Sequence, residues 1–182
     1  MNLIELEKNL IELEKIELKE EELEYKDWLN KEANNNATSI IRNSGRIKAA
    51  LLMAKIFDIA QDYIYIYSKC LSEALTKTNI YYEALEKCVN KNINFKVLLQ
   101  ENTPISEARR LIESKSGNKV KILNFEEIES LNKTTLNMDA HFAIADDKIF
   151  RIEYDPKDYK AFASFNNKEI AIMLKERFLE FI

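Results

Sequence analysis

Residues 139–153 constrain the fold of this chain more than any other stretch, because apolar and polar residues alternate there on both sides of the turn-forming residues 146–148. Alternation with a period of two is typical of half-buried strands, so this stretch predicts a β-hairpin. The same geometry places Asp139 and His141, the only histidine of the chain, on one face of the first strand. The hairpin is therefore the first candidate for a polar site.

Further polar residues are expected close to this hairpin. Arg151 and Glu153 lie two residues apart on the second strand and so share a face. Ser164 and Asn166 stand in a segment that is predicted to open the last helix. On a functional interpretation, these four side chains lie on the same surface as Asp139 and His141.

The same residues also have a structural interpretation. A single histidine in an alternating strand is commonly a half-buried polar residue that one neighbour satisfies. Arg151 and Glu153 can pair with polar residues across the hairpin. Ser164 and Asn166 can act as caps for a helix over residues 168–181, since their side chains can accept from its free backbone N–H groups. The sequence leaves both interpretations open.

The remainder of the domain predicts alternating helices and strands. In order, they are a helix after Gly45, the strand 63–67, a helix near residues 80–90, the strand 95–99, a helix from Ser106 and the strand 119–123. The strand 63–67 alternates tyrosine with isoleucine, which favours a strand buried on both faces over a platform that stacks bases. This order predicts an α/β fold, a mixed sheet with helices on both faces.

Over residues 37–182, the order of elements and the hairpin resemble one half of a phospholipase D-like domain. Catalytic members of that family carry H-x-K-x4-D in the first hairpin strand and a G-S-x-N-like segment later. Placing the turn on the family's turn aligns Asp146 with the motif aspartate, His141 with the lysine and Asp139 with the histidine. Anchoring on His141 as the nucleophile instead aligns Ala143 with the lysine and Lys148 with the aspartate. The phosphate-holding lysine is absent in either register.

The resemblance implies metal-independent chemistry, in which one histidine attacks phosphorus and a second one, from a duplicate half or a two-fold partner, protonates the leaving group. A homodimer would supply two copies of His141, each oriented by Asp146, Asp147 or Glu153. Without the lysine, the charge of the phosphorane would depend on Arg151 alone, and losing such stabilisation typically costs orders of magnitude in rate. The motif therefore indicates impaired catalysis.

Residues 1–35 form a second predicted unit, a long amphipathic helix. The sequence of residues 2–8 recurs unchanged as residues 9–15, which gives a seven-residue period. Leucines recur at alternating spacings of three and four, the pattern of a coiled-coil seam: Leu3, Leu6, Leu10 and Leu13. The helix is expected either to pack on its own domain or to pair with another copy or a protein partner. The polar residues 34–38 separate it from the domain.

Composition limits the other classes of protein. A chain of 182 residues, 46% of them hydrophobic, can bury one α/β core of ordinary size. No stretch approaches the ~20 apolar residues that span a bilayer, and the N-terminus lacks a secretory pattern, so we expect a cytoplasmic protein without a membrane partner. Cys70 and Cys88 have the spacing of neither a zinc site nor a disulfide scaffold and are expected to stay reduced.

No cofactor and no metal are expected. The chain has just two glycines and no nucleotide-binding loop, and its carboxylates lack the regular spacing of a cation site. Nucleic acid is considered as a partner because basic residues gather around the helix after Gly45, although the net charge of −4 disfavours strong phosphate binding. These basic residues are Arg42, Arg46, Lys48 and Lys55.

Together these features predict a degenerate phospholipase D-like domain that is catalytically impaired and acts as a binding or assembly module. One alternative is a homodimeric phosphodiesterase or nuclease that acts on nucleic acid in a bacterial setting, with His141, Arg151, Ser164 and Asn166 in its site. The other is an interaction subunit that docks a larger complex through the N-terminal helix.

Overall fold

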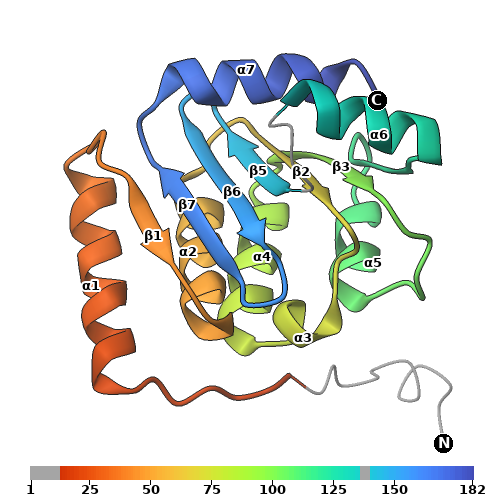
Figure 1. Cartoon of the computed structure of the whole chain (residues 1–182). Coiled ribbons are helices and arrows are strands. Elements are labelled where there is room, and N and C mark those ends of the chain that lie inside the picture. The colour runs from red at the N-terminus through yellow and green to blue at the C-terminus, as the bar shows by residue number, and fades with distance from the viewer. Residues whose placement is uncertain (1–12, 136–139) are drawn as a thin grey trace, which may run out of the picture.

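The computed structural model describes residues 13–135 and 140–182. Within them, a seven-stranded mixed sheet lies between two layers of helices (Figure 1). The strands are β1 (Ile41–Asn43), β2 (Tyr63–Ser68), β3 (Asn94–Leu99), β4 (Lys119–Ile122), β5 (His141–Ala145), β6 (Ile149–Asp155) and β7 (Lys160–Ser164). The helices are α1 (Glu20–Asn34), α2 (Arg46–Ile59), α3 (Glu73–Thr76), α4 (Asn79–Asn90), α5 (Glu107–Glu113), α6 (Phe125–Thr135) and α7 (Lys168–Leu179).

The strand order across the sheet is β1-β7-β6-β5-β2-β3-β4. Strands β2, β3 and β4 are parallel to one another. The pairs β2–β5, β5–β6, β6–β7 and β7–β1 are all antiparallel. Strands β1, β6, β2, β3 and β4 therefore all point the same way. The α/β fold with a mixed sheet and helices on both faces, predicted from the sequence, is confirmed.

The inner strands β2, β5 and β6 are buried along most of their length, with apolar residues on both faces of the sheet. In β2, Ile64 and Ile66 contribute to the core under α2 and α4, while Tyr65 and Tyr67 contribute to the core under α6 and α7. The tyrosine-rich strand is thus a central core strand, as its alternation predicts.

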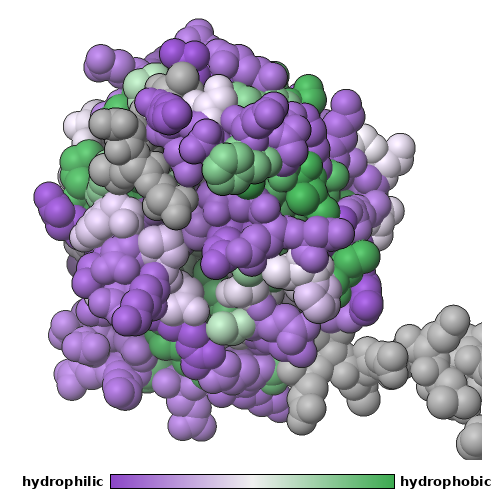
Figure 2. Space-filling model, turned by 45° about the vertical axis from the view of Figure 1, so that its right-hand side comes forward, coloured by the Kyte–Doolittle hydropathy of each residue, from purple (hydrophilic) through white to green (hydrophobic). Residues whose placement is uncertain are grey.

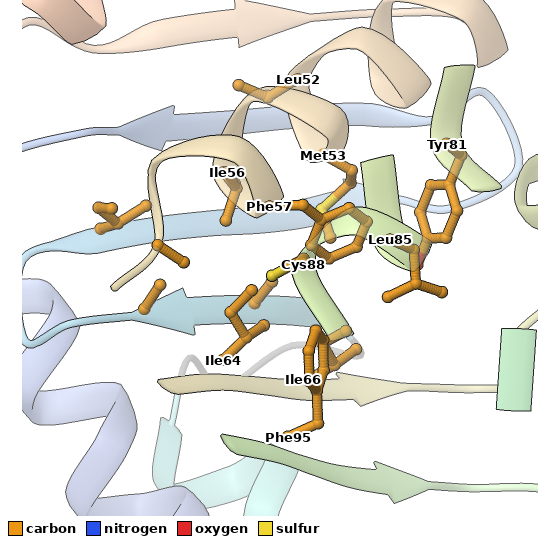
Figure 3. Packing of buried hydrophobic residues seen from close by; sticks show 14 of the residues in the cluster. Leu52, Met53, Ile56, Phe57, Ile64, Ile66, Tyr81, Leu85, Cys88 and Phe95 are labelled. Atoms are coloured by element: carbon orange, nitrogen blue, oxygen red, sulfur yellow. The ribbon is translucent and has the colours of Figure 1, made fainter. Parts of the chain in front are cut away.

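Helices α2 and α4 pack together over the larger of these two cores (Figure 3). Phe57 of α2 is fully buried at its centre. Its ring meets that of Tyr81 edge to face at 5.1 Å between centroids and lies 6.2 Å from that of Phe95. These contacts tie both helices to β3 and, through Tyr81, to the polar site described below.

The N-terminal helix is shorter than the sequence predicts. Residues 13–19 are not helical: Glu14 forms a parallel bridge with Thr78, and α1 begins at Glu20. The expected helix is therefore wrong over residues 13–19, because the backbone of Glu14 bonds to the segment before α4 instead. Leu3, Leu6 and Leu10 of the predicted seam lie outside the described residues. Helix α1 packs against α2 through the buried Leu29.

The last helix begins at Lys168, as predicted, but its cap is not one of the two predicted residues. Ser164 ends strand β7, and the cap of α7 is Asn167, whose side chain accepts from the N–H of Ile170 at 3.1 Å. The prediction that Ser164 and Asn166 cap this helix is wrong, because β7 continues through Ser164 to pair with β6. Four elements have no counterpart in the prediction, namely β1, α3, α6 and β7.

The surface is mostly polar on the face that Figure 2 shows, with small separate apolar patches. Among the helices in the described part of the chain, none combines the length and the apolar character that crossing a membrane requires.

Candidate functional site

The hairpin brings three of the predicted polar residues together in the core. His141 at the start of β5 lies directly opposite Glu153 of β6, and Arg151 lies two residues before Glu153 on the same face. Their exposed fractions are 8% for His141, 7% for Glu153 and 5% for Arg151. We call these three residues the polar triad.

Hydrogen bonds join the triad into one unit. His141 Nδ1 lies 3.1 Å from Glu153 Oε2, and Arg151 Nη2 donates to Glu153 Oε1 at 2.7 Å. His141 Nε2 accepts from the backbone N–H of Lys69 at 3.2 Å. Because an amide N–H can only donate, Nε2 holds a lone pair, and the neutral ring carries its proton on Nδ1 and donates it to Glu153. Both histidine nitrogens and both carboxylate oxygens therefore have partners.

Glu153 is ionised in this arrangement. Its burial by itself would raise its pKa, but the hydrogen bond from His141 and the positive charge of Arg151 outweigh that effect and hold the pKa below its ordinary value of 4.5. A charge this deeply buried is expected to have a charged or hydrogen-bonding partner. Glu153 therefore joins His141 to Arg151 and neutralises the guanidinium.

Arg151 has room in the core because its cross-strand neighbours are the small residues Ala143 and Ala163. Its charge acts on Tyr25 of α1 and Tyr81 of α4, where burial raises the pKa of each hydroxyl and Arg151 partly opposes that rise. Within the described part of the chain, the buried Nε of Arg151 has no hydrogen-bond partner. Such an atom is uncommon and marks a place where an acceptor is missing.

The triad lies at the bottom of a pocket of about 210 Å³. The pocket is at the carboxyl end of β2, between the sheet and the helices α2, α3 and α4. Besides the triad, its lining includes Met53, Leu71, Leu75, Tyr81 and Tyr159. The geometry therefore supplies an apolar chamber with one charged, hydrogen-bonded floor.

The other predicted site residues lie elsewhere. Ser164 pairs with Phe150, near the opposite end of the hairpin from His141, and Asn166 donates from its side chain to the carbonyl of Asn36 at 3.0 Å. Asp139 lies outside the described residues. The structure thus brings together His141, Arg151 and Glu153, and it does not bring Ser164 or Asn166 to them.

Asp146 lies in the hairpin turn and has a structural role there. Asp146 and Asp147 both have positive φ, 50° and 55°, in the three-residue turn between Ala145 and Ile149. The carboxylate of Asp146 accepts from the backbone N–H groups of Gln61, Asp62 and Tyr63 at 2.7, 2.9 and 3.2 Å. It therefore ties the hairpin turn to the start of β2, away from the triad.

We expect Asp146→Ala to lower the free energy of unfolding by about 1–3 kcal/mol, because three backbone N–H groups lose a charged acceptor. Urea denaturation followed by circular dichroism measures this loss. Asp62→Ala is the matched control, since the exposed Asp62 uses its backbone in this contact and its side-chain removal should change stability by less than about 0.5 kcal/mol. Equal stability of the two variants would contradict the anchoring role.

Metal-binding side chains do not cluster in the described part of the chain: it holds no group of three or more His, Cys, Asp or Glu residues suited to a metal ion. Cys70 and Cys88 are both free thiols. Cys70 lines the pocket and is partly exposed, whereas Cys88 is buried.

Several pocket residues were not expected from the sequence. Tyr81 follows the cap Thr78 on α4 and faces the core, but nothing in its local pattern distinguishes it from other core aromatics. The N–H of Lys69 is a backbone group that nearly every residue has, so the sequence does not indicate that it bonds to His141. Tyr159 is held beside the sheet because Asn43 of β1, a strand that was not predicted, donates to its carbonyl at 2.6 Å.

No protein-family model and no curated protein matches this chain. Solved structures that are similar to it include the following two. TrmBL2, described as an archaeal chromatin protein with a novel mode of DNA binding, aligns with a TM-score of 0.53 and 17% identity over 88% of this chain. The alignment covers 61% of TrmBL2, so this chain spans less than two thirds of it. Nuc, a phospholipase D family member from Salmonella typhimurium, aligns with a TM-score of 0.51 and 14% identity over 78% of this chain and 93% of Nuc.

These similarities define the class of fold. The chain has a phospholipase D-like fold, as the hairpin and the order of its elements predicted. At such low identities the likeness concerns the fold alone, and function has to be argued from the site.

Proposed function

We propose that this phospholipase D-like domain is a binding module without phosphodiesterase activity. The observation that carries the proposal is the state of His141. A histidine that attacks phosphorus needs an accessible lone pair, but Nε2 of His141 accepts from the Lys69 amide and the side chain is almost fully buried. Rotation of the ring is opposed by the hydrogen bond from Nδ1 to Glu153.

The cation of the triad supports the same conclusion. Transfer of a phosphoryl group needs positive charge positioned at the developing oxyanion. Arg151 is the cation of the triad, and its charge is already neutralised by Glu153 at 2.7 Å. With no lysine at the motif position in either register, little charge remains to stabilise a phosphorane.

One contact favours the alternative, a homodimeric phosphodiesterase. Glu153 holds Nδ1 of His141, and an acceptor in that position is what an active histidine requires. On this alternative, the Lys69 amide would have to release Nε2, and a second copy of the chain would have to supply a second His141.

Enzyme assays separate these two functions. We expect the purified chain to show no cleavage of a chromogenic phosphodiester or of single-stranded DNA in the presence of a chelator. We expect His141→Ala to lower the free energy of unfolding by about 1–3 kcal/mol, because Glu153 and the Lys69 amide lose a partner. Cleavage that is abolished by His141→Ala, with the melting temperature preserved, would make the chain an enzyme and refute the proposal.

A nucleic-acid partner is suggested by the DNA-binding neighbour TrmBL2, but the basic residues of α2 give it little support. Arg46 pairs with Glu14 at 2.7 Å, Lys48 lies over the ring of Tyr25 and Lys55 pairs with Asp58. Charges engaged in this way contribute less to phosphate binding, which is built from many unpaired cations. We therefore place the binding function in the pocket. Assembly through residues 1–12 stays a prediction, since they lie outside the described residues.

A further inference from the structure

We infer that the pocket binds a small organic monocarboxylate, whose carboxylate meets Arg151 and Tyr81 and whose apolar body lies against Met53, Leu71 and Leu75. This inference rests on the proposed binding function and names the class of its ligand. It follows from the place of the pocket, from its hydrogen-bonding groups and from its charge.

The pocket lies where ligands bind in open α/β sheets, outside the carboxyl ends of the strands. Strands β1, β2 and β6 point the same way, and β2 and β6 lead directly into residues that line the pocket. Its mouth is formed by partly or fully exposed residues: Lys69, Cys70, Ser72, Pro156 and Tyr159. A ligand can therefore reach the buried floor from solvent.

The hydrogen-bond acceptors of the triad are already engaged, whereas one of its donors remains. Both oxygens of Glu153 accept within the triad, and Nε2 of His141 accepts from the Lys69 amide. Arg151 Nε–H is buried and has no acceptor in the described part of the chain. Burial raises the pKa of Tyr81, so its hydroxyl keeps its proton and can donate. The pocket thus calls for a ligand that accepts hydrogen bonds.

The shape and charge of the floor favour a carboxylate over a phosphate. A planar carboxylate matches the planar fork of a guanidinium and can accept from two of its N–H groups. Arg151 carries one charge and Glu153 carries the opposite one beside it. A doubly charged phosphate would meet repulsion from Glu153, with Arg151 as the one cation of the triad to offset it, because Lys69 at the mouth pairs with Glu101. A single negative charge is far less opposed.

The walls require that the ligand have an apolar part. Met53 of α2, Leu71 and Leu75 line the chamber above the floor. In Figure 3, Met53 extends from helix α2 and Tyr81 from helix α4, the two helices that cover this face of the sheet. Branched or cyclic hydrocarbon would replace water against these side chains, which contributes to affinity. A short carboxylic acid such as isovalerate has both required parts.

Alkylation of Cys70 provides the test. Cys70 is partly exposed in the pocket and Cys88 is buried, so alkylation under native conditions reports on Cys70. Burial raises the pKa of the Cys70 thiol, and the reaction is therefore run at mildly alkaline pH. We expect isovalerate to slow alkylation and to raise the melting temperature. We expect isovaleramide, which has the same shape without the charge, and inorganic phosphate to do neither.

A variant of a pocket residue tests whether isovalerate protects Cys70 by binding in the pocket. Substitution of Arg151 would leave Glu153 unpaired in the core, so Tyr81→Phe is used instead, because it removes one hydroxyl and keeps the ring. We expect the isovalerate concentration that gives half protection to rise about ten-fold in Tyr81→Phe, the effect of losing a hydrogen bond to a charged group.

The results that would overturn the inference are distinct from those that would refute the binding function. Absence of protection by isovalerate, or equal protection by isovaleramide, overturns the carboxylate inference, even in a protein without diesterase activity. Protection by phosphate alone also overturns it and favours the phosphodiesterase alternative. Cleavage of a phosphodiester refutes the proposed function itself.

Discussion

Replacement of Glu153 by alanine is expected to lower the free energy of unfolding by about 3–5 kcal/mol, the cost of leaving one partner of a buried ion pair without the other. Arg151 is 5% exposed and its neutralising contact is the 2.7 Å bond to Glu153 Oε1. His141 would lose its acceptor in the same variant. Chemical denaturation at neutral pH measures the loss.

A double variant and a surface variant serve as controls. Arg151→Met combined with Glu153→Gln removes both charges and should recover most of the stability, because no uncompensated charge then remains in the core. Glu101→Gln breaks the ion pair with Lys69, in which both side chains are about half exposed, and should cost less than about 1 kcal/mol. A double variant no more stable than Glu153→Ala would show that the charge of Arg151 is not the cause.

The same interaction predicts the direction of the pH dependence. The pKa of Glu153 is lower in the folded protein than its ordinary value of 4.5. The stability that its ionisation contributes is therefore fully present above pH 4.5 and is lost as the pH falls through the folded pKa. The stability difference between the wild type and Glu153→Ala should stay constant above pH 4.5 and shrink as the pH falls below that value.

Phe57→Ala is expected to have an effect of similar size, about 3–5 kcal/mol, because it opens a cavity in the centre of the larger core. Phe57 is fully buried and contacts the rings of Tyr81 and Phe95. Thermal and urea denaturation both report this loss. The variant should also loosen Tyr81 and weaken protection of Cys70 by isovalerate.

Phe125→Ala is the control for this variant. Phe125 lies at the start of α6 and is 72% exposed, so removing its ring should change the stability by less than about 0.5 kcal/mol. A similar loss in both variants would mean that Phe57 does not anchor the core in the way that its contacts indicate.

The periodic parts of the fold could be predicted from the sequence. The hairpin, the strand beginning at Tyr63 and the helix near Ile80 each have an apolar pattern that only one kind of element satisfies. Strand β1 and helix α3 are too short to show a period. Residues 13–19 have a helical pattern but are not helical in the structure. Glu14 pairs with Thr78 instead, and this tertiary contact outweighs the local helix preference.

The site was predictable to the extent that strand geometry fixes it. Residues opposite each other in a hairpin must meet, so Glu153 was one of three carboxylates expected near His141, and the register of the hairpin pairs these two. Asp146 was assigned to the motif by alignment, but its carboxylate points to the backbone before β2. Contributions from Lys69 and Tyr81 depend on how distant elements pack, and local patterns contain no information on that packing.

The pairing of β1 with β7 bears on how the chain folds during its synthesis. Strands β1 and β2 are synthesised early. Strand β1 can pair with its partner only after residues 160–164 have been synthesised, and one edge of β2 stays unpaired until residues 141–145 have been synthesised. An unpaired apolar strand can bind other nascent chains. We therefore expect the domain to fold late in translation, and a product that stops before the hairpin to aggregate or to be bound by chaperones.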